Sequence, residues 1–231
     1  MLDYRVREAT GPTRRDDGRS CPNAAVLLHG FGANSADLYP LADQLDPKRH
    51  VSWYFPEAPY TIRYGGSPLG KAWFPRDEEQ ITSAVQGVYF HGLEAMDPEG
   101  LRAAGREVNE LLESLNVAWQ GLILGGFSQG AMVAVEAAVQ AGRPPADLFL
   151  LSGAAIAEER WKHELPKLGS FEFFQSHGTA DVILPLGGAR RLYSLLEAAG
   201  GEAEFLQFDG GHGIPPEIVE RAGRRIARRL Q

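Results

Sequence analysis

One serine lies in a pattern that favours a nucleophile. Gly126, Ser128 and Gly130 form Gly-x-Ser-x-Gly, which follows an apolar run at 122–124 and precedes a run of small and apolar residues. This order indicates a strand, a sharp turn and a helix, in which the serine is strained and its hydroxyl exposed. A Cβ atom at either glycine would collide with the neighbouring strand or helix. The bare pattern also fits an ordinary tight turn, and its flanking runs favour the nucleophile.

A serine hydroxyl attacks only when a base takes its proton, and the base needs a third group to orient it. Of the six histidines, His212 lies in a glycine-flanked loop after the last expected strand. His29 and His177 each precede a glycine at the end of an expected strand, and the others have no such context: His50, His91 and His163. We therefore predict that His212 is the base.

Three aspartates could orient that histidine. Asp181 follows an expected strand in a turn that contains glycine and alanine, whereas Asp147 begins a strand and so lies at the wrong end of the sheet. Asp209 is too close to His212 in sequence to reach behind its ring. The predicted set is Ser128, Asp181 and His212, in the chain order found in α/β-hydrolases.

Buried strands and amphipathic helices are expected to position these residues. Apolar runs predict strands at 24–28, 122–127, 148–151 and 171–174, and alternation predicts others at 2–6, 50–55 and 203–208. Helices are expected from Asn34 or Ser35 through Leu45, from a cap at Asp97 to about Leu115, at 186–199 and after Pro215. Strands that alternate with helices predict an α/β fold with a mostly parallel central sheet and helices on both faces.

Residues 60–95 are the least regular part of the sequence, rich in aromatic residues, glycine and proline. A long segment of this kind is usually functional or mobile, although its aromatic residues could also simply cover the core. An exposed aromatic patch there would favour a homodimer or a lipid-facing surface.

Composition narrows the function. The chain has 231 residues, 44% of them hydrophobic and 23% charged, which suits a single α/β domain over residues 1–231. A net charge of −7 argues against a nucleic-acid partner. A single cysteine forms no intrachain disulfide and no metal-binding cysteine cluster. No signal pattern or membrane-length apolar run is present, so the expected location is the cytoplasm.

Five sequence blocks resemble the phospholipase/carboxylesterase family, which includes the acyl-protein thioesterases. They lie at 28–32, 126–130, 151–153, 177–181 and 210–214. The resemblance implies a small α/β-hydrolase fold without a large cap domain, with no cofactor and no metal. It also implies that the backbone N–H groups of Phe31 and Gln129 form the oxyanion hole. That agrees with their positions, because Gln129 follows the nucleophile and Phe31 lies in the first glycine-rich loop.

The expected activity is hydrolysis of carboxylic esters or thioesters, of the carboxylesterase, lysophospholipase or thioesterase kind, through an acyl-serine intermediate. An acyl chain needs an apolar wall, and five residues that flank the predicted site could supply it or could equally be core: Trp73, Phe74, Ile183, Leu184 and Ile214. The substrate would be a small ester or thioester, including acyl-lipids. Two alternatives stay open, namely a non-catalytic binding protein with the same fold and a peptidase-type acyl hydrolase.

Overall fold

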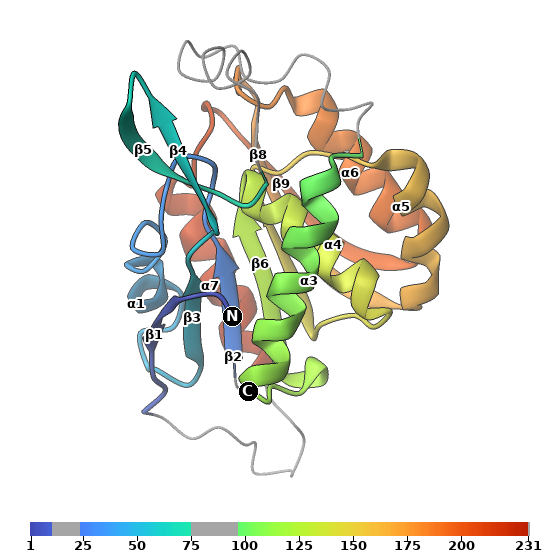
Figure 1. Ribbon diagram of the computed structural model, residues 1–231. Helices are drawn as coiled ribbons and strands as arrows, with labels where there is room; N and C mark the ends of the chain where they lie inside the picture. The colour runs from blue at the N-terminus through green and yellow to red at the C-terminus, as the bar shows by residue number, and fades with distance from the viewer. Residues whose placement is uncertain (11–23, 75–96, 231) are drawn as a thin grey trace.

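A central sheet organises the molecule (Figure 1). The computed structural model describes residues 1–10, 24–74 and 97–230. Seven of its strands are hydrogen bonded in the order β1-β3-β2-β6-β7-β8-β9. β1 runs antiparallel at one edge, and the other neighbouring strands are parallel. The strands are β1 (Tyr4–Arg7), β2 (Ala24–Leu28), β3 (Ser52–Pro56), β6 (Leu122–Phe127), β7 (Asp147–Leu151), β8 (Phe171–Gly178) and β9 (Gly201–Phe208).

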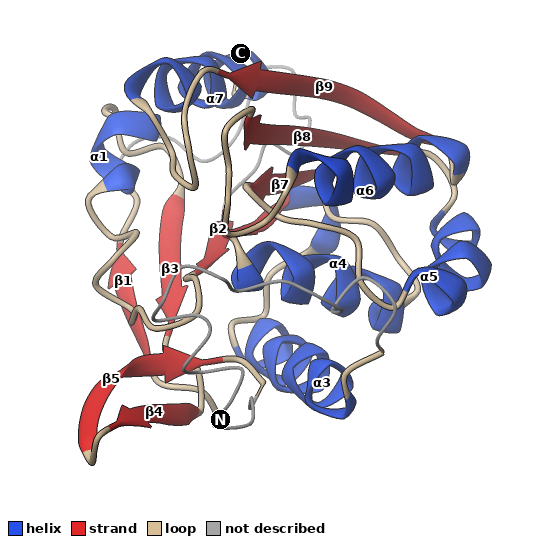
Figure 2. Ribbon diagram, turned by 90° about the horizontal axis from the view of Figure 1, so that it is seen from above, coloured by secondary structure: helices blue, strands red, loops and turns tan. Residues whose placement is uncertain are grey.

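Helices cover both faces of this sheet (Figure 2). One face packs against α1 and α7, and the other packs against α3, α4, α5 and α6. The helices are α1 (Leu41–Leu45), α3 (Glu99–Ser114), α4 (Gln129–Ala141), α5 (Glu158–Glu164), α6 (Leu186–Ala198) and α7 (Pro216–Arg229). Short 3₁₀ turns lie at Trp119–Gly121 and Leu165–Leu168.

Strand β2 shows why the apolar runs form this fold. It lies between β3 and β6, and all five of its residues are buried. Val26 and Leu28 pack into the cluster beneath α3 and α4, while Ala25 and Leu27 pack into the cluster beneath α1 and α7. Side chains alternate between the two faces of a strand, so a strand covered on both sides must be apolar throughout. The predicted α/β fold with a mostly parallel sheet is confirmed.

The expectation of an irregular segment from residue 60 is wrong for residues 60–72. These residues form a hairpin of β4 (Tyr60–Tyr64) and β5 (Ser67–Ala72), a second sheet that stands apart from the main one (Figure 1). Gly65 and Gly66 connect the strands with φ angles of 54° and 82°. Two consecutive positive φ angles suit the tight turn that matches strand twist, and glycine adopts them without strain. The rest of the predicted segment, residues 75–96, lies outside the described residues.

The helix expected from residue 34 or 35 is shorter than predicted, because α1 begins only at Leu41. Pro40 immediately precedes it and lacks the N–H group that a continuing helix would use. Proline also disfavours the helical conformation at the residue before it. Asn34 does not cap a helix either, since its Oδ1 accepts the N–H of Ala36 over 2.9 Å in a local turn.

The C-terminal helix is fixed to the sheet by ion pairs. Asp147, at the start of β7, is completely buried and accepts hydrogen bonds of 2.7 Å from Nε of both Arg225 and Arg229. These arginines lie on α7, so the buried carboxylate has charged donors that compensate its loss of hydration.

Within the described residues, no helix is both long enough and apolar enough to span a membrane.

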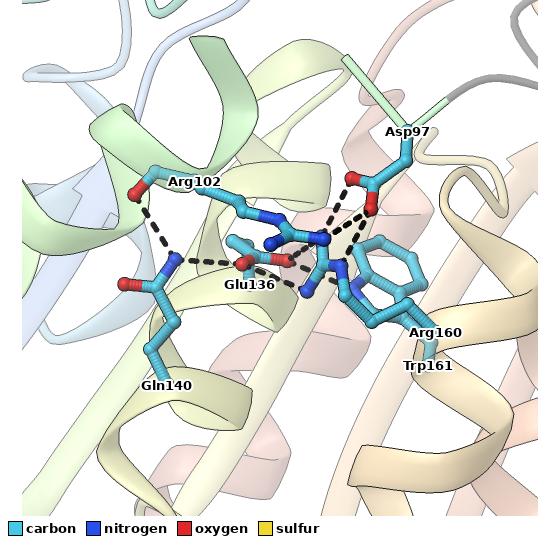
Figure 3. A network of polar contacts seen from close by, with 6 residues as sticks. All are labelled: Asp97, Arg102, Glu136, Gln140, Arg160 and Trp161. Atoms are coloured by element: carbon cyan, nitrogen blue, oxygen red, sulfur yellow. Dashed lines mark hydrogen bonds and ion pairs between the residues drawn. The ribbon is translucent and has the colours of Figure 1, made fainter. Parts of the chain in front are cut away.

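Asp97 joins a polar network instead of capping α3. Pro98 occupies the N-cap position, and no side chain caps the helix. Arg160 of α5 lies between Asp97 and the buried Glu136 of α4 (Figure 3). Its Nε and Nη2 donate to the two oxygens of Asp97 over 2.7 and 2.8 Å. The network therefore ties the chain entering α3 to α4 and α5.

Replacing Asp97 with asparagine is expected to lower the free energy of unfolding at pH 7 by about 1 kcal/mol, which allows for the exposure of the pair. Hydrogen bonds from Arg160, and then from Arg102, lower the pKa of Asp97 from 3.8 to about 2. A depressed pKa stabilises the fold above the unfolded-state pKa, and this contribution is lost as the pH falls from about 4 towards 2. Urea unfolding at pH 7 and pH 3 measures it, with the exposed Asp37→Asn as control. An equal difference at both pH values would contradict the assignment.

Candidate active site

Ser128 occupies the sharp turn between β6 and α4. Its φ and ψ angles are 55° and −118°, a conformation that is strained for a residue with a side chain. A Cβ at Gly126 would lie 2.4 Å from the carbonyl carbon of Gly130 and 2.7 Å from Leu28 O. A Cβ at Gly130 would lie 2.1 Å from that same oxygen. Glycine is therefore required on both sides of Ser128, for the steric reason given in the sequence analysis.

Ser128 is less accessible than the sequence indicated, because only 4% of the residue is exposed. Its N–H donates to the carbonyl of Leu151 over 2.9 Å, so the end of β7 closes against the turn. The loop after β2 is also close to this turn, since a Cβ at Gly30 would lie 3.4 Å from Ser128 Cβ. The serine thus lies at the base of the loops that follow β2 and β7.

The hairpin holds the loop that carries Phe31. Gly32 N–H donates to Lys71 O over 2.8 Å, and Lys71 N–H donates to Ala33 O over 2.8 Å. Gly70 permits this approach, because a Cβ there would lie 1.9 Å from Gly32 O. A segment that looked irregular in the sequence therefore fixes the backbone next to the serine.

His29 supports the same loop and is not available as a base. Its Nε2 accepts the N–H of Ala58 over 3.1 Å, so the proton is on Nδ1, which donates to Gly30 O over 2.8 Å. Burial lowers the pKa of His29 and keeps the ring neutral. The indole Nε1 of Trp73 donates to the His29 carbonyl over 2.8 Å and completes the support.

Asp181 and His212 form a short hydrogen bond. His212 Nδ1 lies 2.7 Å from Asp181 Oδ2, and the aspartate is 6% exposed. An ionised carboxylate is only an acceptor, so His212 Nδ1 carries a proton, and in the neutral ring Nε2 is the nitrogen with a lone pair. The two residues follow β8 and β9, so both lie at the carboxyl edge of the sheet, where β6 delivers Ser128.

The Asp181 carboxylate is strongly stabilised as an anion. Burial alone would raise its pKa, but hydrogen bonds from His177 and His212 and from the N–H of Leu184 outweigh burial and place the pKa well below its usual range. Its Oδ1 accepts the N–H groups of Ile183 and Leu184, each over 2.9 Å. The carboxylate is therefore ionised and its orientation is fixed.

Neighbouring strand ends hold the His212 loop beside the serine turn. The ring of Phe127, the residue before Ser128, lies 4.8 Å from the His212 ring, centroid to centroid. Ser152 Oγ donates to Gly213 O over 2.9 Å. A Cβ at Gly178 would lie 2.2 Å from Gly211 O, so the end of β8 packs directly against this loop.

The five residues expected to form an apolar wall divide into two groups. Trp73, Phe74 and Leu184 have 2% exposure or less and pack in the core. Ile183 and Ile214 are half-buried and keep exposed surface beside Asp181 and His212. Packing accounts for the first group, and only the second has surface to offer a ligand.

The side chain of Gln129 has a role that the sequence analysis missed. Its Oε1 accepts the N–H of Trp73 over 2.9 Å, and its Nε2 donates to Phe74 O over 3.3 Å. This buried amide ties the first turn of α4 to the chain after the hairpin. The only sequence signal is a long polar residue next to Ser128, at the start of a helix whose next six residues are glycine or apolar. Among the described residues, no group of three or more histidine, cysteine, aspartate or glutamate side chains could hold a metal ion.

A serine in a strand–turn–helix unit at the carboxyl edge of this sheet, with an aspartate–histidine pair from later strand ends, defines an α/β-hydrolase. The sequence profile of the Phospholipase/Carboxylesterase family matches residues 17–228. The chain belongs to that family and is a hydrolase.

Individual relatives agree with this assignment. The chain is 28% identical to "Acyl-protein thioesterase 1" of Eremothecium gossypii over 211 residues, which cover 86% of this chain and 84% of the relative. It is 26% identical to the protein of the same name from Candida albicans over 218 residues, covering 88% and 89%. Among solved structures, Zea mays acyl-protein thioesterase 2 aligns over 100% of both chains with a TM-score of 0.77 and 23% identity. Esterase PE8 aligns over 99% of both chains with a TM-score of 0.77 and 24% identity.

Proposed function

We propose that Ser128, His212 and Asp181 are a catalytic triad that hydrolyses carboxylic esters or thioesters through an acyl-serine intermediate. The observation that carries this proposal is the 2.7 Å hydrogen bond from His212 Nδ1 to Asp181. It leaves His212 Nε2 as the ring nitrogen able to accept a proton from Ser128. The strained turn and the family membership of the chain support the same assignment.

The reaction has two steps. His212 Nε2 takes the proton of Ser128 Oγ as this oxygen forms a bond to the substrate carbonyl carbon, and Asp181 stabilises the imidazolium. The tetrahedral intermediate then expels the alkoxide or thiolate, which receives that proton from His212. Water attacks the acyl-serine with the same histidine as base, and the carboxylic acid leaves as Ser128 regains its proton.

The backbone N–H groups of Phe31 and Gln129 are the proposed oxyanion donors. Gln129 opens α4, so its N–H is one of those that have no partner inside the helix, and the helix dipole favours an anion there. Phe31 lies in the loop that the hairpin holds beside Ser128. Donors that are already in place stabilise the transition state without reorganisation.

Replacing Gly70 with alanine is expected to lower kcat by up to about 10²-fold, the effect of weakening one oxyanion donor, with little change in KM. The new Cβ would collide with Gly32 O and move the loop that carries Phe31. Steady-state ester hydrolysis measures this, with the exposed Leu69→Ala on the same strand as control. Full activity in folded Gly70→Ala would show that the Phe31 loop does not supply a donor.

The proposed substrates are acyl esters and thioesters whose acyl group lies against Ile183 and Ile214. These side chains flank Asp181 and His212 and keep exposed apolar surface. The names of the two fungal relatives point to thioesters, and the family description points to carboxylic esters. A peptidase-type reaction has no comparable support, because no relative or structure cited above carries such a name.

Hydrolysis of p-nitrophenyl esters from acetate to palmitate, and of matching acyl thioesters, tests the proposal. We expect turnover with a chain-length optimum that measures the acyl site. A fluorophosphonate probe should label Ser128, identified by mass spectrometry of the modified peptide. No turnover and no labelling would favour a non-catalytic binding protein. Labelling at another residue would overturn the assignment of the nucleophile.

A further inference from the structure

A second histidine lies against Asp181. His177, near the end of β8, is completely buried. Its Nε2 lies 2.7 Å from Leu184 O and 3.2 Å from Asp181 Oδ2. Both oxygens are acceptors, so Nε2 must carry a proton that it shares between them. The Asp181 carboxylate therefore contacts two imidazole N–H groups on one oxygen, those of His177 and His212.

The other nitrogen of His177 indicates its protonation state. Nδ1 is buried and has no hydrogen-bond partner within the described part of the chain. A proton there would be a buried donor without an acceptor, so Nδ1 holds a lone pair and the ring is neutral. Burying an unpaired nitrogen is unfavourable, and a leucine or phenylalanine would pack in the core without that penalty. The contacts of Nε2 give a reason for histidine at this position.

We propose that His177 is a positioning residue for Asp181 and acts as a neutral N–H donor from behind the carboxylate. This inference rests on the proposed triad. The amides of Ile183 and Leu184 hold Oδ1, while His177 and His212 share Oδ2. A carboxylate held at both oxygens cannot rotate away from His212. The bond from His177 to Leu184 O also fixes the turn that supplies the two amides.

The neutral state of His177 matters for the charge balance. A cationic ring would cancel the charge of Asp181, and that charge is needed when His212 becomes an imidazolium during the reaction. A neutral donor orients the carboxylate and leaves its charge available. His177 therefore acts on the reaction through Asp181 and does not contact the substrate.

Two amide substitutions separate this role from packing. In His177→Gln the side-chain nitrogen reaches the place of the imidazole Nε2, whereas in His177→Asn it reaches only the place of Nδ1. Both variants bury a neutral amide, so each is a matched control for the other. We expect His177→Asn to lower kcat about 10- to 100-fold with KM within about twofold, the effect of one hydrogen bond to a charged group. His177→Gln should keep kcat within about threefold of the unsubstituted protein.

The pH profile of kcat/KM gives a signature that packing would not produce. Without the donor, more of the Asp181 charge falls on His212, so the acid limb in His177→Asn should move to higher pH by about half a unit. The profile of His177→Gln should coincide with that of the unsubstituted protein. Equal activity loss in both folded variants with unshifted limbs would overturn the proposal. So would full activity in His177→Asn.

A measurement on the unsubstituted protein needs neither variant nor activity. Long-range ¹H–¹⁵N spectra distinguish the two neutral imidazole forms, and we expect His177 to be the Nε2–H tautomer at pH 8. The Nδ1–H tautomer would overturn the proposal even if both variants failed to fold. Failure of the triad proposal would appear differently, as an unsubstituted protein with no hydrolysis and no probe labelling at Ser128.

Discussion

Replacement of Ser128 by alanine is expected to lower kcat for ester hydrolysis by about 10⁶-fold, as nucleophile removal does in serine proteases. The substitution removes the oxygen that forms the acyl-enzyme, and nothing else in the turn can take its place. The fold should remain, because Ser128 bonds Leu151 through its backbone N–H and not through its hydroxyl. Alanine retains the Cβ, so the strain at φ 55° is unchanged.

The measurement is single-turnover and steady-state hydrolysis by the variant beside Ser194→Ala, in which an exposed serine of α6 is removed. Ser194→Ala should retain full activity, and Ser128→Ala should also lose labelling by the fluorophosphonate probe. A Ser128→Ala protein that is folded and still forms an acyl-enzyme would show that the nucleophile lies elsewhere.

The elements around Ser128 could be predicted because their signals are local. An apolar run must become a buried strand here, and Gly126 and Gly130 are required by contacts with the adjoining helix and strand. The pairing of Asp181 with His212 followed from topology, because parallel strands bring their carboxyl ends to one edge. Strand ends and chain order were sufficient to bring these residues together.

The supporting contacts could not be predicted because they join residues far apart in the sequence. Nothing near Gln129 signals that its amide holds the backbone of Trp73 and Phe74. Asp97 has the sequence context of a helix cap, yet Arg160 competes for it across the fold. A local turn signal was also missed. Two consecutive glycines such as Gly65 and Gly66 are typical of a tight hairpin turn, whose two central residues need positive φ angles.

Substitution of Asp181 by asparagine is expected to lower kcat about 10⁴-fold while the geometry of the site is kept. The backbone N–H groups of Ile183 and Leu184 point at Oδ1, so the amide oxygen of the variant must remain there. The new NH₂ group then faces His212 Nδ1, at the place of Oδ2. Two donors cannot bond each other, so His212 moves its proton to Nε2 and can no longer accept the proton of Ser128.

Asp181→Asn and the exposed Asp209→Asn are matched variants, because both aspartates precede His212 in the last part of the chain and only one contacts it. Asp209→Asn should retain activity. If Asp209→Asn lost activity while Asp181→Asn kept it, the two aspartates would exchange roles.

The pKa of Asp181 lies below its usual range, so its carboxylate stays ionised at pH 5 and above and stabilises the fold there. Any loss of activity between pH 8 and pH 5 should therefore not come from titration of Asp181. A profile that follows an aspartate in that range would contradict the hydrogen bonding described for Asp181.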